Sequence, residues 1–180
     1  HGLLVHVHTI SETIKWMIRN DYQTKVGFRQ GDIFFNNDPY IGGAHCLDQM
    51  IIIPIVHGEE VVGWAAGLTH VPETGAVEPG GYGAWFRSRF EEGLFLPCVR
   101  VGENDRFFHD IEVLVDRSTR TSTWWHTDNR AKFTGSRIIR DEVLKIIGEI
   151  GLDRYQKLTY EYIEDSLRAT KQRIRQVLHP

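Results

Sequence analysis

The sequence predicts an α+β fold, and three observations lead to this class. Extended runs rich in Ile, Val and Phe fall in the first half of the 180 residues. In the second half, apolar residues recur at the helical period of about 3.6. Hydrophobic residues make up 41% and charged residues 25% of the chain, which is a globular composition. We therefore expect a strand-rich part over residues 1–100 and a helical part over residues 101–180, joined as one continuous domain or as a fragment of a larger one.

The first residues predict a strand followed by a short helix. Residues 3–8 alternate as an extended segment does, which places His6 and His8 on one strand face. A structural role is the simpler interpretation of these two histidines, and an approach to a site is the alternative. Thr9 and Glu12 have the spacing of a capping box, so we expect the helix to begin there.

Three further strands are expected in the first half. Residues 31–36 and 49–56 are rich in Ile and Phe. A turn over residues 57–60 follows, and residues 61–69 run back along the preceding segment. Residues 49–69 therefore predict a β-hairpin.

Two loops flank this hairpin. Residues 37–44 combine Asn, Asp, Pro and Gly and are a loop by every local rule. Residues 71–84 contain four Gly and two Pro, but they are apolar and lie close to Trp85 and Phe86. This composition is unlike that of a flexible linker, so we expect an ordered loop near a site.

From about residue 104 the pattern changes to three helices. The second of them is expected to stop near Gly151. The aromatic cluster at 124–126 is most simply part of a core or of a subunit interface. The three expected apolar faces consist of Phe107, Ile111, Leu114 and Val115; of Ile138, Ile139, Val143, Ile146 and Ile147; and of Tyr160, Ile163, Leu167, Ile174 and Leu178.

Charge and hydropathy argue against two classes of partner. The chain has 21 basic and 24 acidic residues, and residues 91–180 carry 15 of each, so neither half has the basic excess of a nucleic-acid binder. The longest apolar run, residues 50–56, is seven residues long. A bilayer span needs roughly 20 such residues, so no membrane partner is expected.

Cysteine usage and the chain ends suggest where the protein works and how complete it is. Two cysteines are too few for a disulfide framework and indicate a reducing, cytoplasmic location. The chain opens without an initiator Met or a charged leader and ends abruptly at Pro180. We therefore expect no signal peptide and a segment of a longer subunit.

One group of residues has the composition of a metal site. His45 and Asp48 are three residues apart, so a tight loop brings them to one side. The predicted hairpin places its outer ends side by side, which brings His70 next to Asp48. Two imidazoles and one carboxylate suit a divalent transition metal with open positions for water or substrate. These residues do not choose between zinc, manganese and iron(II), and a chance grouping is the alternative in a chain with nine histidines.

Other chemistries find less support. Cys46 lies in the same loop and could be a soft ligand, although buried packing is the simpler interpretation. Asp38 is the nearest candidate acid or base, but an Asp before Pro is typical of a turn, so catalytic residues stay unassigned. The glycines at 80–83 do not form a dinucleotide fingerprint, and neither a phosphate-binding Gly-Lys-Ser/Thr motif nor a nucleophile elbow occurs, so no cofactor-binding residues are expected.

The motifs around this group resemble a known family. Residues 31–48 read Gly-Asp-Ile-Phe-Phe-Asn-Asn-Asp-Pro-Tyr-Ile-Gly-Gly-Ala-His-Cys-Leu-Asp and resemble the signature of the hydantoinase B family. That family includes N-methylhydantoinase subunits, one half of 5-oxoprolinase and the large alpha-type subunits of acetone and acetophenone carboxylases. Residues 62–80, with a single His70 followed by Val-Pro-Glu-Thr-Gly, are similar to the ketone carboxylase branch. The resemblance continues through residues 90–94 and 137–140.

The resemblance implies a role in ATP-dependent ketone carboxylation. It implies an alpha-type subunit whose sister subunits, including a hydantoinase A-like subunit, use ATP and Mg. The ketone would be activated as an enol phosphate and bicarbonate as carboxyphosphate, and the derived enolate would add to CO2 to give a 3-oxo acid. It also implies that the metal ligands are His45, Asp48 and His70. The loop at 71–84 with Trp85 and Phe86 would then offer the ketone an apolar wall.

Two alternatives stay open. The same family motif fits a subunit of an ATP-dependent cyclic amide hydrolase of the hydantoinase or 5-oxoprolinase type, in which the cation would polarise a carbonyl or activate water. The chain would otherwise be a non-catalytic scaffold subunit with a degenerate or structural site. A structural site is closed by protein ligands, whereas a catalytic site keeps a position for water.

Overall fold

The computed structural model describes residues 4–178, and the chain divides into two compact units. The first unit is His1–Arg140 and the second is Asp141–Pro180. A five-stranded antiparallel sheet lies in the first unit, and helices make up the second. The expected α+β class is thus confirmed, while the expected boundary near residue 100 stays a prediction.

The sheet has the order β3-β2-β1-β4-β5. Its centre is the hairpin of β2 and β3, whose register runs from the pair Asp48 and His70 to the pair His57 and Glu60. The expected hairpin is confirmed and is one residue longer at each end. The strands are β1 (Ile33–Asn36), β2 (Asp48–His57), β3 (Glu60–His70), β4 (Val99–Glu103) and β5 (Arg106–Phe107).

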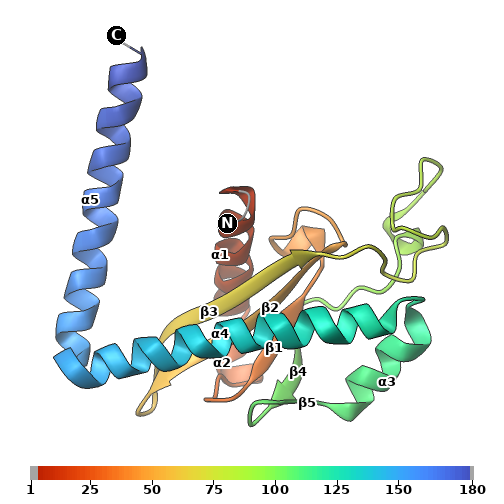
Figure 1. Cartoon of the computed structure of the whole chain (residues 1–180), viewed down its shortest axis with the longest axis horizontal. Helices are drawn as coiled ribbons and strands as arrows, with labels where there is room; N and C mark the ends of the chain where they lie inside the picture. The colour runs from red at the N-terminus through yellow and green to blue at the C-terminus, as the bar shows by residue number, and fades with distance from the viewer. Residues whose placement is uncertain (1–3, 179–180) are drawn as a thin grey trace. The chain divides into compact units, whose positions relative to one another are not determined.

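The two faces of this sheet carry different helices. Because side chains alternate along a strand, Phe34, Met50 and Ile52 point to one face, where they pack with Met17 of α1 (Leu4–Arg19). Phe35 points to the other face and packs against Trp125 of α4 (Ser122–Ile150), with ring centroids 5.7 Å apart. Figure 1 shows the part of α4 that belongs to the first unit, residues 122–140, in front of the sheet and α1 behind it.

Helix α1 corrects the expectation for the N-terminus. Residues 4–8 are helical, so the strand expected over residues 3–8 is wrong for them; residue 3 lies outside the described residues. The Thr9 hydroxyl donates to the His6 carbonyl at 2.9 Å, inside the helix, so it does not cap a helix start. A short alternation does not outweigh the packing of a continuous helix on the sheet.

Shorter elements complete the first unit. Strands β4 and β5 were not expected from the sequence. Phe107, expected on a helical face, lies in β5, and its ring centroid is 5.8 Å from that of Phe133. In the aromatic cluster at 124–126, Trp125 is buried and Trp124 is exposed. The remaining elements are α2 (Tyr22–Lys25), the 3-10 turns η1 (Pro39–Ile41) and η2 (Arg89–Glu91), and α3 (His109–Ser118).

The second unit consists of the end of α4 and α5 (Leu152–Leu178). The break between them falls at Gly151, as expected, where a positive φ of 82° favours glycine. The expected third helix is confirmed over Leu152–Leu178, yet its apolar residues, such as Tyr160 and Ile174, are exposed.

Lys132 is a buried charge on the α4 face of the sheet. Its stem packs against Gly67, and its Nζ donates to the Gln49 carbonyl at 3.1 Å. Burial lowers the pKa of Lys132 to about 7, from an ordinary 10.5. Between these values the unfolded chain binds more protons than the folded chain, so folding stability rises with pH across this window. Below about pH 7 the full cost of burying the charge is present.

Replacing this lysine with an apolar residue of similar length is therefore expected to stabilise the fold at neutral and lower pH. We predict that Lys132→Met raises the melting temperature at pH 6.5, because it raises the free energy of unfolding by an amount on the order of a few kcal/mol. This increase in the free energy of unfolding should shrink as the pH approaches 10. Thermal denaturation across this pH range measures it. The exposed Lys145 on the same helix provides the control variant Lys145→Met. A gain that does not change with pH would contradict the prediction.

Candidate metal centre

The hairpin positions two of the three expected ligands. Asp48 is the first residue of β2 and His70 is the last residue of β3, and the two are register partners. Asp48 lies two residues before Met50, so its side chain is on the sheet face that α1 covers. His45 precedes the strand in a tight turn, in which the Asp48 amide donates to the His45 carbonyl at 3.0 Å.

The three side chains converge on one point. His45 Nδ1 lies 3.3 Å from Asp48 Oδ2, and His70 Nδ1 lies 3.4 Å from Asp48 Oδ1. One ligand atom from each residue lies within 4.8 Å of the others. The Asp48 side chain is 1% exposed, whereas His45 and His70 are 37% and 46% exposed. A buried carboxylate thus faces two accessible imidazoles.

Two atoms of this group fit a bound cation. Asp48 Oδ2 and His45 Nδ1 are both buried, and neither has a hydrogen-bond partner. A buried polar atom without a partner is costly, and a metal ion satisfies both atoms at once. Metals bound at about 2.0–2.2 Å hold neighbouring ligand atoms roughly 3 Å apart, which agrees with the observed 3.3 Å. Within residues 4–178 this group has three members, which leaves further coordination positions open.

A cavity of about 320 Å³ lies beside His45. Tyr82 forms one side of this cavity, and its ring centroid lies 5.7 Å from that of His45 and 6.0 Å from that of His70. Lost hydration and then the Asp48 carboxylate raise the pKa of Tyr82. At Gly81 a Cβ atom would collide with the Leu47 side chain, and φ is +70°, so glycine allows this close approach. The lining residues are His45, Cys46, Leu47, Gly81, Tyr82, Gly83, Phe86 and Glu92.

The loop expected near a site therefore borders the cavity. Phe86 contributes to its wall, whereas Trp85 is 82% exposed and does not line it. The sequence did not single out Tyr82 or Glu92, because neither belongs to a spacing motif. The only available signal for Tyr82 is its place in the aromatic, glycine-rich loop, and the only one for Glu92 is its place in the segment that follows this loop.

The residues that surround the ligands support the loop. Cys46 is buried and its thiol contacts the Glu92 carbonyl at 3.3 Å, and among the described residues it is outside the group whose ligand atoms converge, which agrees with a packing role. Burial raises the pKa of this thiol to about 11. Asp38 accepts the Tyr40 amide at 2.9 Å, as a turn residue does. Asn37, which the sequence did not single out, donates to the carbonyls of Cys46 and Leu94 at 3.1 and 2.9 Å.

Comparison with known proteins identifies the family. Residues 1–179 match the family described as hydantoinase B/oxoprolinase. The chain belongs to this family. It is 37% identical, over 99% of its length, to the acetone carboxylase alpha subunit of Xanthobacter autotrophicus. It is 36% identical, over 69% of its length, to the acetophenone carboxylase delta subunit of Aromatoleum aromaticum.

Two solved structures share the fold of this chain. A nucleotide-free acetone carboxylase structure matches 89% of this chain with a TM-score of 0.85 at 39% identity. An ATP-dependent caprolactamase from Pseudomonas jessenii matches 87% with a TM-score of 0.79 at 21% identity, which shows the fold alone.

The chain spans about a quarter or less of the relatives named above: 23% of the acetone carboxylase alpha subunit and 18% of the acetophenone carboxylase delta subunit. The expectation of a segment of a larger subunit is confirmed. Among residues 4–178, no helix combines the length and the hydropathy that crossing a lipid bilayer requires.

Proposed function

We propose that this chain is the metal-holding segment of an alpha-type subunit of an ATP-dependent ketone carboxylase. The observation that carries the proposal is the convergence of His45, Asp48 and His70 in a chain 37% identical to an acetone carboxylase alpha subunit. His45 and His70 would supply neutral nitrogen ligands, and Asp48 would supply a buried anionic one.

The proposed site suits the chemistry of an enolate. A divalent cation supplies Lewis-acid stabilisation of the oxyanion that develops when a ketone is converted to an enolate. The cavity beside His45, at about 320 Å³, has the size of a small-molecule site, and Phe86 and Tyr82 give it aromatic walls. These walls would orient a small ketone beside the candidate ligands. Whether the metal is manganese, zinc or iron is left open by this donor set.

The proposal includes partners that this chain does not contain. By its likeness to an acetone carboxylase whose carboxylation is ATP-dependent, ATP with Mg would be used on sister subunits, including a hydantoinase A-like subunit. These would supply the enol phosphate of the ketone and the carboxyphosphate made from bicarbonate. The assembly would work in the cytoplasm.

A second function is favoured by one specific likeness. The caprolactamase beta subunit of Pseudomonas jessenii is 24% identical over 69% of this chain. A cyclic amide hydrolase would use the same donor set to polarise an amide carbonyl or to activate water. The lower identity ranks this function below ketone carboxylation. A scaffold role ranks lower again, because three ligands leave open positions that a closed structural site lacks.

ATP consumption by the natively purified assembly tests the proposal. The assembly is offered a panel of ketones and cyclic amides, each with and without bicarbonate. We predict ATP turnover that requires both a ketone and bicarbonate. Turnover with a cyclic amide that does not need bicarbonate would replace the proposal with the hydrolase function. No turnover above background with any substrate would favour the scaffold role.

A further inference from the structure

A third histidine faces the buried carboxylate of the candidate site. His6 Nε2 lies 3.7 Å from Asp48 Oδ1, and the His6 side chain is 21% exposed. His6 belongs to α1, whereas the three candidate ligands belong to the hairpin and the loop before it. Its ligand atom is outside the group of three whose atoms lie within 4.8 Å of one another. It therefore contacts the carboxylate from outside the candidate ligand set.

The helix holds His6 on the face that packs against the sheet. Residues spaced by three, four or seven along a helix share a face, so Thr9 and Thr13 follow His6 on the same side. Thr9 and Thr13 are both buried. His8, two residues further on, is exposed. The orientation of His6 thus follows from the helical period of α1, whereas the sequence alone predicts a strand at these residues.

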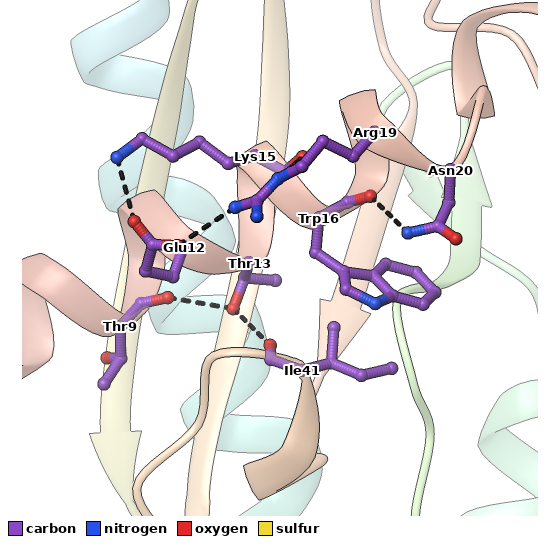
Figure 2. Close-up of polar contacts among 8 residues, drawn as sticks. All are labelled: Thr9, Glu12, Thr13, Lys15, Trp16, Arg19, Asn20 and Ile41. Carbon is purple, nitrogen blue, oxygen red and sulfur yellow. Dashed lines mark hydrogen bonds and ion pairs between the residues drawn. The ribbon is translucent and has the colours of Figure 1, made fainter.

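Contacts with the site loop fix the position of this helix. The Thr13 hydroxyl lies between the Thr9 carbonyl, at 2.9 Å, and the Ile41 carbonyl, at 2.8 Å, as Figure 2 shows. The loop backbone approaches so closely at Gly42 that a Cβ atom there would lie 2.7 Å from the Thr13 amide nitrogen. The helix and the loop that carries His45 are therefore packed as one body, and His6 is held close to Asp48.

The two oxygens of Asp48 have different surroundings. Oδ2 faces His45 and has no hydrogen-bond partner. Oδ1 faces both His6 and His70. If His70 binds a cation through Nδ1, that nitrogen can no longer donate to Oδ1. Among the described residues, His6 is then the side chain in reach of Oδ1 that can still donate to it.

We propose that His6 is a positioning residue for the metal centre. Its Nε2 lies 3.7 Å from Asp48 Oδ1, just beyond hydrogen-bonding distance. With a cation held by the three ligands, a small approach of the ring would let Nε2–H donate to Oδ1, which would leave Oδ2 free to ligate the cation. This inference rests on the metal site of the proposed function. Outer partners of this kind fix the orientation of a ligand, and their loss typically lowers metal affinity by about 10–100-fold.

Metal affinity of the purified assembly tests this role. Mn²⁺ binding is measured by competition with a chelator, and the Co²⁺-loaded protein gives a visible spectrum that reports the ligand set. His6→Ala should weaken Mn²⁺ binding by about 10–100-fold while the Co²⁺ spectrum keeps the shape of the wild type. His6→Gln, whose amide nitrogen can occupy the place of Nε2, should restore most of the affinity. His8→Ala, on the exposed side of the same helix, should bind as the wild type does.

The outcomes separate this inference from the function on which it rests. If the wild type binds Mn²⁺ and His6→Ala binds it equally well, the positioning role is wrong and the metal site stands. If His6→Gln binds as weakly as His6→Ala, or if the Co²⁺ spectrum changes as it does when His70 is replaced, His6 acts through its ring as a ligand or packing group and the hydrogen-bond role is wrong. If the wild type binds neither ion, both proposals fail.

Discussion

Asp48→Ala is expected to abolish metal binding and carboxylation while the assembly stays intact. Asp48 supplies the only anionic group of the three and lies between both imidazoles, so its loss removes a ligand and the charge that attracts the cation. The effect should exceed the roughly 10–100-fold loss expected for a group that only supports a ligand. Metal content of the purified assembly and ketone-dependent ATP turnover measure it.

His70→Ala is expected to have the same effect, because His70 is the register partner of Asp48. A matched control is His57→Ala, since His57 is exposed at the opposite end of the same hairpin. That variant should keep its metal and its turnover. Full turnover in a metal-depleted Asp48→Ala or His70→Ala assembly would overturn the proposed role of the site.

The grouping of the three candidate ligands could be predicted because it depends on local chain geometry. A hairpin joins its outer ends whatever the rest of the fold does, so Asp48 and His70 had to meet once residues 49–69 paired. His45 follows from a turn of three residues. The sequence could not predict that Asp48 Oδ2 is buried without a hydrogen-bond partner. The burial of this end of the hairpin depends on α1 and on the loops.

The N-terminal helix could not be predicted, because its signal conflicts with a local pattern. Residues 4–8 alternate as a strand does, but they belong to a helix that packs Met17 on the sheet and bonds Thr13 to the Ile41 carbonyl of the loop. Strands β4 and β5 gave no signal because they are short and contain charged residues such as Arg100 and Arg106. The error at residues 4–8 also concealed the contact of His6 with Asp48.

The last prediction concerns the attachment of the loop at 71–84 to the rest of the first unit. The buried Glu73 carboxylate accepts the Gly75 amide at 2.6 Å, the Arg120 amide at 2.9 Å and the Arg120 guanidinium at 2.6 Å. Arg120 lies between α3 and α4, so this carboxylate ties the start of the cavity loop to the helical layer. Breaking a buried ion pair costs about 3–5 kcal/mol, and because Arg120 is 48% exposed we expect about 2–3 kcal/mol here.

Glu73→Ala should therefore lower the melting temperature and expose residues 71–84 to proteolysis. The apparent affinity for the ketone should fall more than the affinity for Mn²⁺, because Glu73 holds the cavity wall and not the ligands. Glu73→Gln keeps the acceptor oxygen and loses the charge, so its effect should be intermediate. The exposed Glu78 in the same loop supplies the control Glu78→Ala, which should behave as the wild type. An equal loss of Mn²⁺ affinity and ketone affinity would contradict this division, since it would mean that the loop and the ligands depend on one another.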